Sequence, residues 1–196
     1  RVATFTDGVG ARGGPQADVL EAARERLGEF NAACRVLGAD AAWRTTAPFP
    51  DNALDTVSLL SLVQLMERLL RDWSPSVVYT HHAGDLNIDH QLIARAVITA
   101  ARPYPGQVVK RIYGFEVPGS TEWAAPGAVP FVPTRFVPLT SKQLDVKRRA
   151  LLCYESEQRN QPHPRSWPLV DALARVRGSQ AGHFAAEAFT VIREIA

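Results

Sequence analysis

The segment at residues 77–90, "VVYTHHAGDLNIDH", constrains the fold of this chain more than any other part of the sequence. Its first residues are apolar without polar alternation, which is typical of a strand buried on both faces of a parallel sheet. A polar loop follows, and from Asp89 onward the apolar residues recur at helical spacing. Strand, polar loop and helix in this order predict one βαβ step of an α/β protein.

The rest of the chain has the same kinds of pattern. Apolar, β-rich runs predict strands at 2–6, 42–46, 76–82, 108–117, 134–139 and 186–195. Apolar residues spaced at threes and fours predict helices at 19–37, 59–73, 89–102, 141–155 and 169–177. We therefore expect a single α/β domain over residues 1–196, with a mostly parallel sheet.

Composition limits the classes of partner and the cellular location. Of the 196 residues, 46% are apolar and 21% are charged, and the formal net charge is +2. Because acids are interspersed among the bases, no patch predicts binding to nucleic acid. No apolar run approaches the ~20 residues of a membrane span. Cys34 and Cys153 lie far apart, which favours free thiols and a reducing, cytoplasmic location.

Polar side chains gather where two of the predicted strands end. Strand 2–6 runs into "DGVGARGG", and strand 76–82 runs into the loop rich in histidine and aspartate. Ligands of open α/β sheets bind beyond the carboxyl ends of the strands, and parallel strands end on the same side. We therefore expect the two segments to lie on one rim of the sheet and to form the functional site.

His90 is the strongest candidate for a metal ligand in this cluster. In the first turn of a helix the dipole disfavours protonation, and metals bind the neutral imidazole. The neighbouring Asp89 can orient a ligand histidine, although an acid at this place also suits a helix N-cap. His81 and His82 point to opposite faces of their strand, so at most one of them shares the pocket of His90.

A catalytic zinc ion takes three protein ligands and one water molecule. His90 is one ligand, and Asp7, at the end of the first strand, is a candidate for the second. The chain has no Cys-x-x-Cys or His-x-x-x-His pair to supply the rest, so the ligand set is incomplete. His163 and His183 stand alone in the sequence, which favours surface or structural roles.

The chain resembles the LmbE-like or PIG-L family of zinc-dependent N-deacetylases in five segments that occur in the same order. The most specific is "GDLNIDH" after "YTH", and the others are "TFTDGVGARGG", "PDNALDT", "FEVPGSTEW" and "AEAF". The resemblance implies a Rossmann-like, three-layer α/β domain. It also implies hydrolysis of an N-acetyl or N-acyl amide on an amino sugar or glycoconjugate, with Zn²⁺ or another divalent metal as cofactor.

The resemblance implies roles for single residues as well. His90 matches the zinc-binding histidine of the family's Asp-His pair, with Asp89 beside it at the catalytic centre. The other two ligands and the general base belong to a His-Pro-Asp-Asp motif at the end of the family's first strand. That motif does not occur in residues 1–196, so we expect this sequence to lack the first β-α unit. Many relatives carry a histidine at the position of Asn87, which leaves His82 as the candidate donor to the oxyanion.

Sugar hydroxyl groups need fixed polar partners. The nearest such groups in the matching segments are Asp7, Arg12, Asp51, Asn52 and Asn87, which we expect to contact a small-molecule substrate. Arg12 could also be a plain loop charge, and Asp51 with Asn52 could form a turn and a helix cap.

Two other functions stay open from the sequence. The absent motif favours a non-catalytic, carbohydrate-binding or partner domain of the same fold. Gly8, Gly10 and Gly13 fit the spacing Gly-x-Gly-x-x-Gly of a nucleotide-binding loop. That match is weak without an acid about 20 residues further on, at the end of a second strand. The sequence does not determine the sugar, the acyl group or the oligomeric state.

Overall fold

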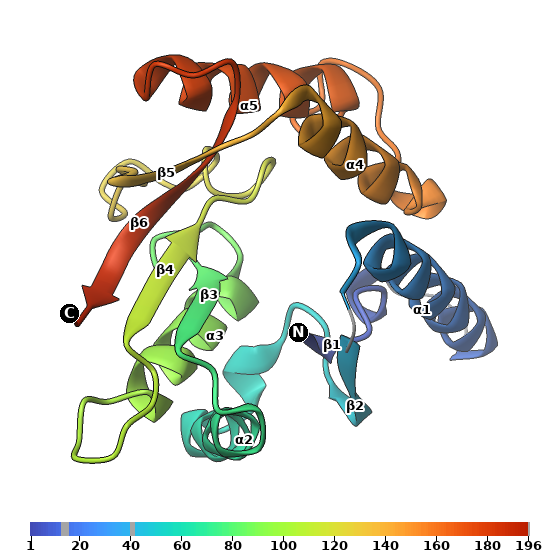
Figure 1. Cartoon of the computed structure of the whole chain (residues 1–196). Helices are drawn as coiled ribbons and strands as arrows, with labels where there is room; N and C mark the ends of the chain where they lie inside the picture. The colour runs from blue at the N-terminus through green and yellow to red at the C-terminus, as the bar shows by residue number, and fades with distance from the viewer. Residues whose placement is uncertain (13–15, 40–41, 196) are drawn as a thin grey trace. The chain divides into compact units, whose positions relative to one another are not determined.

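The computed structural model describes residues 1–12, 16–39 and 42–195 (Figure 1), without the side chains of 12, 16, 17 and 42–48. The chain forms two compact units. The first unit consists of Arg1–Ala53 and Pro138–Ala186, and the second consists of Leu54–Val137 and Glu187–Ala196. Each unit therefore combines segments that lie far apart in the sequence.

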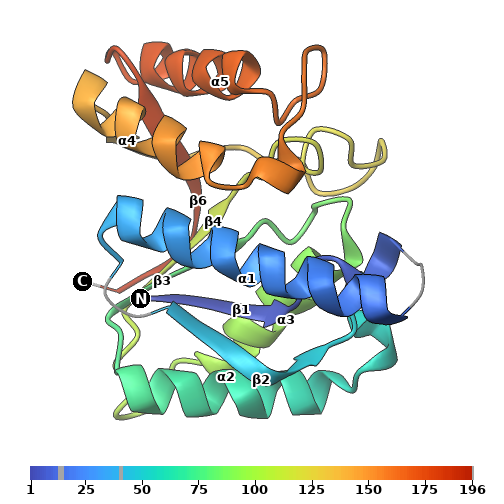
Figure 2. The ribbon, with the colours of Figure 1, turned by 90° about the vertical axis from the view of Figure 1, so that its right-hand side faces the viewer.

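The first unit contains a parallel strand pair with a helical connection. β1 (Val2–Thr6) pairs in parallel with β2 (Ala42–Phe49), and η1 (Gly10–Arg12) and α1 (Gln16–Leu37) connect them. Later in the chain come α4 (Ser141–Leu152), η3 (Glu155–Glu157) and α5 (Trp167–Gln180). Figure 2 shows α4 beside α1, and the two helices are in contact. The strands predicted at 2–6 and 42–46 and the helix predicted at 19–37 therefore form a βαβ step in this unit.

The second unit begins with a helical pair and a second parallel strand pair. Its elements are η2 (Leu54–Thr56), α2 (Leu59–Trp73), β3 (Val77–His81), α3 (Ile88–Ala100) and β4 (Arg111–Phe115). α2 packs against α3, and α3 packs against β3. β3 and β4 pair in parallel, with Tyr79 opposite Tyr113. The predicted sequence of strand, loop and helix at residues 77–90 is confirmed.

The sheet that contains β3 is mixed, so the prediction of a mostly parallel sheet is wrong. Its strand order is β3-β4-β6-β5, where β5 is Arg135–Pro138 and β6 is Ala186–Glu194. β6 runs antiparallel to β4. Backbone hydrogen bonds can form in either direction, so the apolar content of a strand does not fix its direction. The first residues of β6 alternate between buried and half-buried positions, a pattern common in antiparallel strands.

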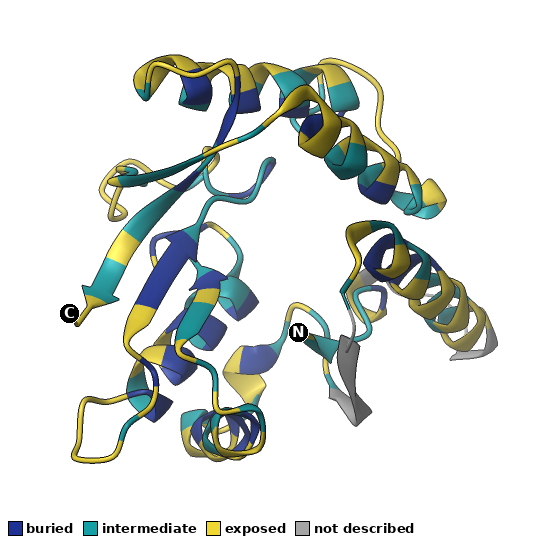
Figure 3. Ribbon diagram, in the orientation of Figure 1, coloured by how far each residue is buried: buried dark blue, intermediate teal, exposed yellow. Residues whose placement is uncertain are grey.

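Apolar stripes on the helices form the core of the second unit. On α2, the buried residues recur at helical spacing and include Leu62, Met66 and Leu69. Ser58 begins this helix by accepting the N–H group of Ser61, and Ser74 ends it in the left-handed conformation with φ 45°. Figure 3 shows the buried residues of α2, α3 and β4. The apolar stripe predicted for residues 59–73 is confirmed.

β3 is less buried than its apolar sequence predicts. It stands at the end of the strand order, Val77 and Val78 are half-buried, and Tyr79 is 49% exposed. The prediction of burial on both faces is therefore wrong for this strand.

The predicted single domain and three-layer order concern the chain as a whole and stay predictions. None of the described helices has the length and apolar content needed to cross a membrane.

Candidate active site

The loop between β3 and α3 holds the histidine cluster of the second unit. β3 ends at His81, and α3 begins at Ile88 because the extended residue Asn87 caps it. The Asn87 Oδ1 accepts the N–H groups of Asp89 (2.8 Å) and His90 (3.3 Å), which have no acceptor within the helix. The cap fixes His90 in the first turn. The interpretation of Asp89 as the N-cap is wrong, because Asn87 has that role.

His90 is held at one nitrogen of its ring. Its Nδ1 lies 3.0 Å from the Oδ1 of Asp85. The side chain of His90 is 21% exposed, whereas that of Asp85 is 0% exposed. An ionised carboxylate only accepts hydrogen bonds, so Nδ1 carries a proton and donates to Asp85, and in the neutral form of the ring the lone pair lies on Nε2. Within the described part of the chain, no residue forms a hydrogen bond with this Nε2.

Asp85 is a buried carboxylate surrounded by donors. Burial alone would raise its pKa, but hydrogen bonds from His90, Ser120, the Asn87 N–H and Thr121 outweigh that effect. The pKa of Asp85 therefore lies well below its usual range. The Asp85 side chain is thus ionised at neutral pH and serves as a fixed acceptor beneath His90.

His81 shares the pocket of His90. The two rings stack with centroids 4.1 Å apart and an interplanar angle of 11°. Burial, together with the nearby His90, lowers the pKa of His81 to about 3, against a smaller opposing effect of Asp85. The ring is therefore neutral at physiological pH. The prediction that at most one of His81 and His82 lies with His90 is confirmed, and His81 is that residue.

His82 points to a different set of neighbours. It is buried, its Nε2 lies 2.8 Å from the carbonyl oxygen of Val129, and its ring lies nearly perpendicular to that of Phe131, at 84°. A carbonyl oxygen only accepts, so Nε2 donates this hydrogen bond. The predicted role of His82 as an oxyanion donor stays a prediction, and it requires this bond to be released.

Asp89 binds the backbone of η2. It is buried, and its Oδ1 accepts the backbone N–H of Leu54 at 2.9 Å. Leu54 begins η2, so this hydrogen bond links the start of α3 to η2. The carboxylate that contacts the Nδ1 of His90 is that of Asp85 and not that of the adjacent Asp89. The catalytic role predicted for Asp89 stays a prediction.

The second unit supplies one side chain, His90, that is arranged as a ligand for a zinc ion. A neutral imidazole with Nδ1 on a buried carboxylate and Nε2 free is the usual arrangement of a metal-binding histidine. The ring lone pairs of His81 and His90 lie in nearly parallel planes, so the two cannot meet at one ion in this arrangement. Among the described residues, no three histidine, cysteine, aspartate or glutamate side chains gather as a metal site.

The predicted substrate residues of the first unit stabilise its turns. The Oδ1 of Asp7 accepts the N–H groups of Val9 (3.0 Å) and Gly10 (2.9 Å), which closes the turn after β1. The Oδ1 of Asp51 accepts a hydrogen bond from the Thr6 hydroxyl at 3.1 Å. Asp51 therefore ties the segment after β2 to the end of β1. The structure places Asp7 and Asp51 together in this unit.

Asn52 and Arg12 complete the predicted set. Asn52 is exposed and has φ 55° in the turn after Asp51, a conformation that asparagine adopts more readily than most residues. The turn predicted for Asp51 and Asn52 is confirmed. Arg12 ends η1, and its side chain lies outside the described residues. Because β1 and β3 belong to different units, the expected common rim stays a prediction.

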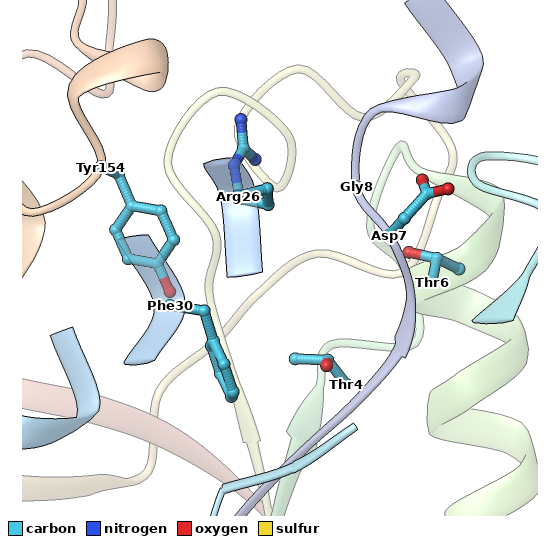
Figure 4. A pocket seen from close by; sticks show the side chains of 7 residues that line it. All are labelled: Thr4, Thr6, Asp7, Gly8, Arg26, Phe30 and Tyr154. Atoms are coloured by element: carbon cyan, nitrogen blue, oxygen red, sulfur yellow. The ribbon is translucent and has the colours of Figure 1, made fainter. Parts of the chain in front are cut away.

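A pocket of about 210 Å³ opens beside Asp7 in the first unit (Figure 4). It is lined by Thr4, Thr6, Asp7, Gly8, Arg26, Phe30 and Tyr154. Figure 4 shows Phe30 and Tyr154 on one side and Thr6 and Asp7 on the other. Hydroxyl groups, a carboxylate, a guanidinium group and aromatic rings suit a ligand with several hydroxyl groups and an apolar face.

Arg26 is fixed in this pocket by the buried Glu29 and the half-buried Glu157. Its Nε lies 2.9 Å from Glu29, and its Nη2 bonds to Glu157 and, at 3.0 Å, to the Ser156 hydroxyl. A Cβ at Gly8 would lie 3.5 Å from the remaining nitrogen, Nη1. Nη1 is therefore the part of the guanidinium group that faces Gly8, in the lining of the pocket.

The residues of these sites that the sequence did not single out as site residues include Asp85, His81 and Arg26. Arg26 and Glu29 are three residues apart on one helix face, and this spacing was the available signal for a fixed arginine. His81 belongs to the predicted cluster, but strand alternation does not say which of two successive histidines faces α3. The link from Asp85 to His90 depends on how the loop folds, and no spacing rule encodes it.

Comparison with solved structures shows the fold. A conserved protein of Thermus thermophilus is 24% identical with a TM-score of 0.73, over 99% of this chain and 81% of that one. The N,N'-diacetylchitobiose deacetylase of Pyrococcus horikoshii is 17% identical with a TM-score of 0.73, over 97% and 72%. The 4-carboxy-2-hydroxymuconate hydratase GalB of Pseudomonas putida is 21% identical with a TM-score of 0.72, over 100% and 84%.

The family follows from the sequence itself. No curated protein gave a significant match. The family model PIG-L, described as GlcNAc-PI de-N-acetylase, matches residues 1–101, which is more than half of the 196 residues. The matched range contains β1, the pocket residues of α1, and the loop and helix that hold Asp85 and His90. The resemblance seen in the sequence is confirmed, and the chain belongs to the PIG-L family.

Proposed function

We propose that this protein hydrolyses the N-acetyl, or another N-acyl, group of an amino sugar or glycoconjugate. Support comes from the family description, a de-N-acetylase, and from the similar deacetylase of N,N'-diacetylchitobiose. The observation that carries the proposal is the imidazole of His90. Its Nδ1 is held by the buried Asp85, and its Nε2 is left for a metal ion at the reacting centre.

Zn²⁺, or another divalent metal, is the cofactor in this proposal. A bound zinc ion polarises the amide carbonyl and lowers the pKa of its water. His90 is the ligand supplied by the described residues. The family resemblance assigns the other ligands and the general base to a His-Pro-Asp-Asp motif, which residues 1–196 do not contain.

The proposal gives His82 and Asp89 separate tasks at the centre. His82 donates to the oxyanion after its Nε2 leaves the Val129 carbonyl, and loss of such a donor typically costs about 10²–10³ in rate. Asp89 binds the Leu54 N–H and so keeps the first turn of α3, and with it His90, in place.

The pocket beside Asp7 is the proposed site for the sugar ring. In the pocket, Asp7 accepts hydrogen bonds from sugar hydroxyl groups and the Nη1 of Arg26 donates one. Asp51, which holds the Thr6 hydroxyl of the lining, is assigned a further hydroxyl group. Phe30 and Tyr154 cover an apolar face of the ring. Hydroxyl recognition of this kind needs side chains that are already fixed, and Arg26 meets this condition through Glu29 and Ser156.

Three further contacts complete the proposed substrate set. Arg12 follows the Asp7 turn in the sequence, and the exposed Asn52 follows Asp51, whose carboxylate binds Thr6; both are assigned to contacts with a glycoconjugate. Asn87 uses its Oδ1 for the cap of α3, so its amide NH₂ group is the part assigned to the substrate.

Acetate release from N,N'-diacetylchitobiose by the full-length protein tests this function. We expect zinc-dependent release by the wild type, loss of release in His90→Gln, and wild-type rates in His163→Gln. His163 serves as the control because its ring bonds to the backbone of Arg165, outside both proposed sites. Equal acetate release by wild type and His90→Gln would refute the proposal.

A non-catalytic carbohydrate-binding domain is the alternative. The absence of a three-ligand metal cluster from the described residues favours it. In that case, binding of the same disaccharide persists with a chelator present and in His90→Ala, and no acetate is released. The two functions therefore give opposite results in one pair of assays.

A further inference from the structure

We propose that Asp85, held by Ser120 and Thr121, is a positioning residue that fixes the tautomer and the orientation of His90. The inference rests on the proposed function, since it takes the Nε2 of His90 as the atom that binds the metal. It gives a role to the segment "GSTEW" (residues 119–123), whose Ser120 and Thr121 bind Asp85. This segment takes no part in the cap of α3 or in the proposed sugar pocket.

The hydroxyl of Thr121 is directed toward Asp85 by the backbone. Its Oγ1 accepts the N–H of Val117 at 2.7 Å and lies 2.7 Å from the Oδ2 of Asp85. Because the backbone N–H already occupies an acceptor position, the single hydroxyl proton goes to Asp85. Thr121 therefore fixes one carboxylate oxygen.

The other carboxylate oxygen has three donors. The Oδ1 of Asp85 accepts the Asn87 N–H at 2.9 Å, the Ser120 hydroxyl, and the Nδ1 of His90 at 3.0 Å. The Leu86 N–H also donates to the Ser120 carbonyl at 3.4 Å, which joins the two loops through the backbone. With both oxygens fixed in a side chain that is 0% exposed, Asp85 has little freedom to rotate.

This arrangement determines which nitrogen of His90 is free. A carboxylate surrounded by donors accepts a hydrogen bond from the Nδ1–H group, so the proton stays on Nδ1 and the lone pair of the neutral ring lies on Nε2. A histidine without such a partner can take the other tautomer, in which Nε2 carries the proton and cannot bind a metal. Removal of the hydrogen-bond partner of a metal-binding histidine typically lowers metal affinity about 10–100-fold.

A purely structural role for Asp85 is the competing explanation, because the same hydrogen bonds tie residues 85–87 to 117–121. The two explanations differ in one observable. A structural tie affects the stability of the fold, whereas a positioning residue also sets the tautomer of His90 within the folded protein.

Long-range ¹H–¹⁵N spectra of the metal-free, full-length protein measure that tautomer directly. The His90 signals are assigned by their absence in His90→Gln. We expect the Nδ1–H form in wild type and a shift toward Nε2–H in Asp85→Ala, with zinc affinity lowered about 10–100-fold. Asp85→Asn keeps an acceptor oxygen and is expected to restore much of the Nδ1–H form. Asp145→Asn, which removes an exposed acid paired with Arg149, is expected to match wild type.

Several results would overturn the inference. One is an Nε2–H tautomer in wild type, and another is an unchanged tautomer and zinc affinity in a folded Asp85→Ala. If Asp85→Ala does not fold, Ser120→Ala removes one donor and leaves the carboxylate, and an unchanged zinc affinity there counts against the proposal. Failure of the wild type to release acetate contradicts the proposed function instead, because the tautomer is measured without metal or substrate.

Discussion

Gly84 lies where the loop after β3 meets the backbone near Val129. It is buried, and a Cβ at this position would clash with the Val129 carbonyl oxygen and lie 2.8 Å from the His82 Nε2. Only a residue without a side chain allows the His82–Val129 hydrogen bond and this close approach together. The residue-scale packing of the loop therefore depends on glycine.

We predict that Gly84→Ala lowers the free energy of unfolding by about 1–3 kcal/mol, as overpacking does. The control is Gly28→Ala on α1, where a Cβ meets no atom within 4 Å. An alanine in a helix interior is favoured over glycine by about 0.5–1 kcal/mol, so Gly28→Ala is expected to stabilise. Urea unfolding of both variants measures the two effects, and a neutral Gly84→Ala would contradict the packing argument.

At the scale of elements, α4 shows how a local signal starts a helix. The Thr140 hydroxyl accepts the Gln143 N–H at 3.2 Å, and the Gln143 Oε1 accepts the Thr140 N–H at 2.8 Å. This reciprocal pair is a capping box. It explains why the helix begins at Ser141, as the sequence predicts.

We predict that Thr140→Ala lowers the free energy of unfolding by about 0.5–2 kcal/mol, because the first turn of α4 loses its cap. Thr140→Ser keeps the hydroxyl and is expected to stay within a few tenths of a kcal/mol of wild type. Thermal unfolding followed by circular dichroism compares the variants. An equal loss of unfolding free energy in Thr140→Ala and Thr140→Ser would show that the methyl group of Thr140, and not its capping hydroxyl, stabilises the helix.

The helices and strands follow from the sequence because periodicity and caps are local. The direction of β6 does not follow from its apolar content, because pairing direction depends on how the chain returns to the sheet. The orientation of His90 is harder to predict for a related reason. Side chains of adjacent residues on a helix diverge, and the Nδ1 of His90 bonds to Asp85 rather than to Asp89. Asp85 reaches it because the preceding loop folds back, which involves Ser120 and Thr121 from a distant segment.

At the scale of the whole molecule, the first unit depends on contacts between two distant stretches of chain. The buried Glu29 of α1 accepts the Ser156 N–H at 2.8 Å and its hydroxyl at 2.9 Å, and it pairs with Arg26. Burial alone would raise the pKa of Glu29, but the hydrogen bonds from Ser156 and Arg26 outweigh it and lower the pKa. Its carboxylate form therefore stabilises the fold.

A group with a lowered pKa in the folded state stabilises the protein above its unfolded pKa and loses this effect as the pH falls. The usual glutamate value is 4.5. We predict that Glu29→Gln lowers the free energy of unfolding by about 1–3 kcal/mol at pH 7, and by less at about pH 3, below the usual carboxyl pKa. Urea unfolding at the two pH values checks this. If wild type and Glu29→Gln differ in unfolding free energy by the same amount at both pH values, the role of the ionised carboxylate is contradicted.

The most direct test of the central claim is the zinc content of the full-length protein after equilibrium dialysis against dilute Zn²⁺. The account predicts about one ion per wild-type chain, loss of that ion in His90→Gln, and wild-type content in His163→Gln. Equal zinc in wild type and His90→Gln, or none in wild type, would contradict it.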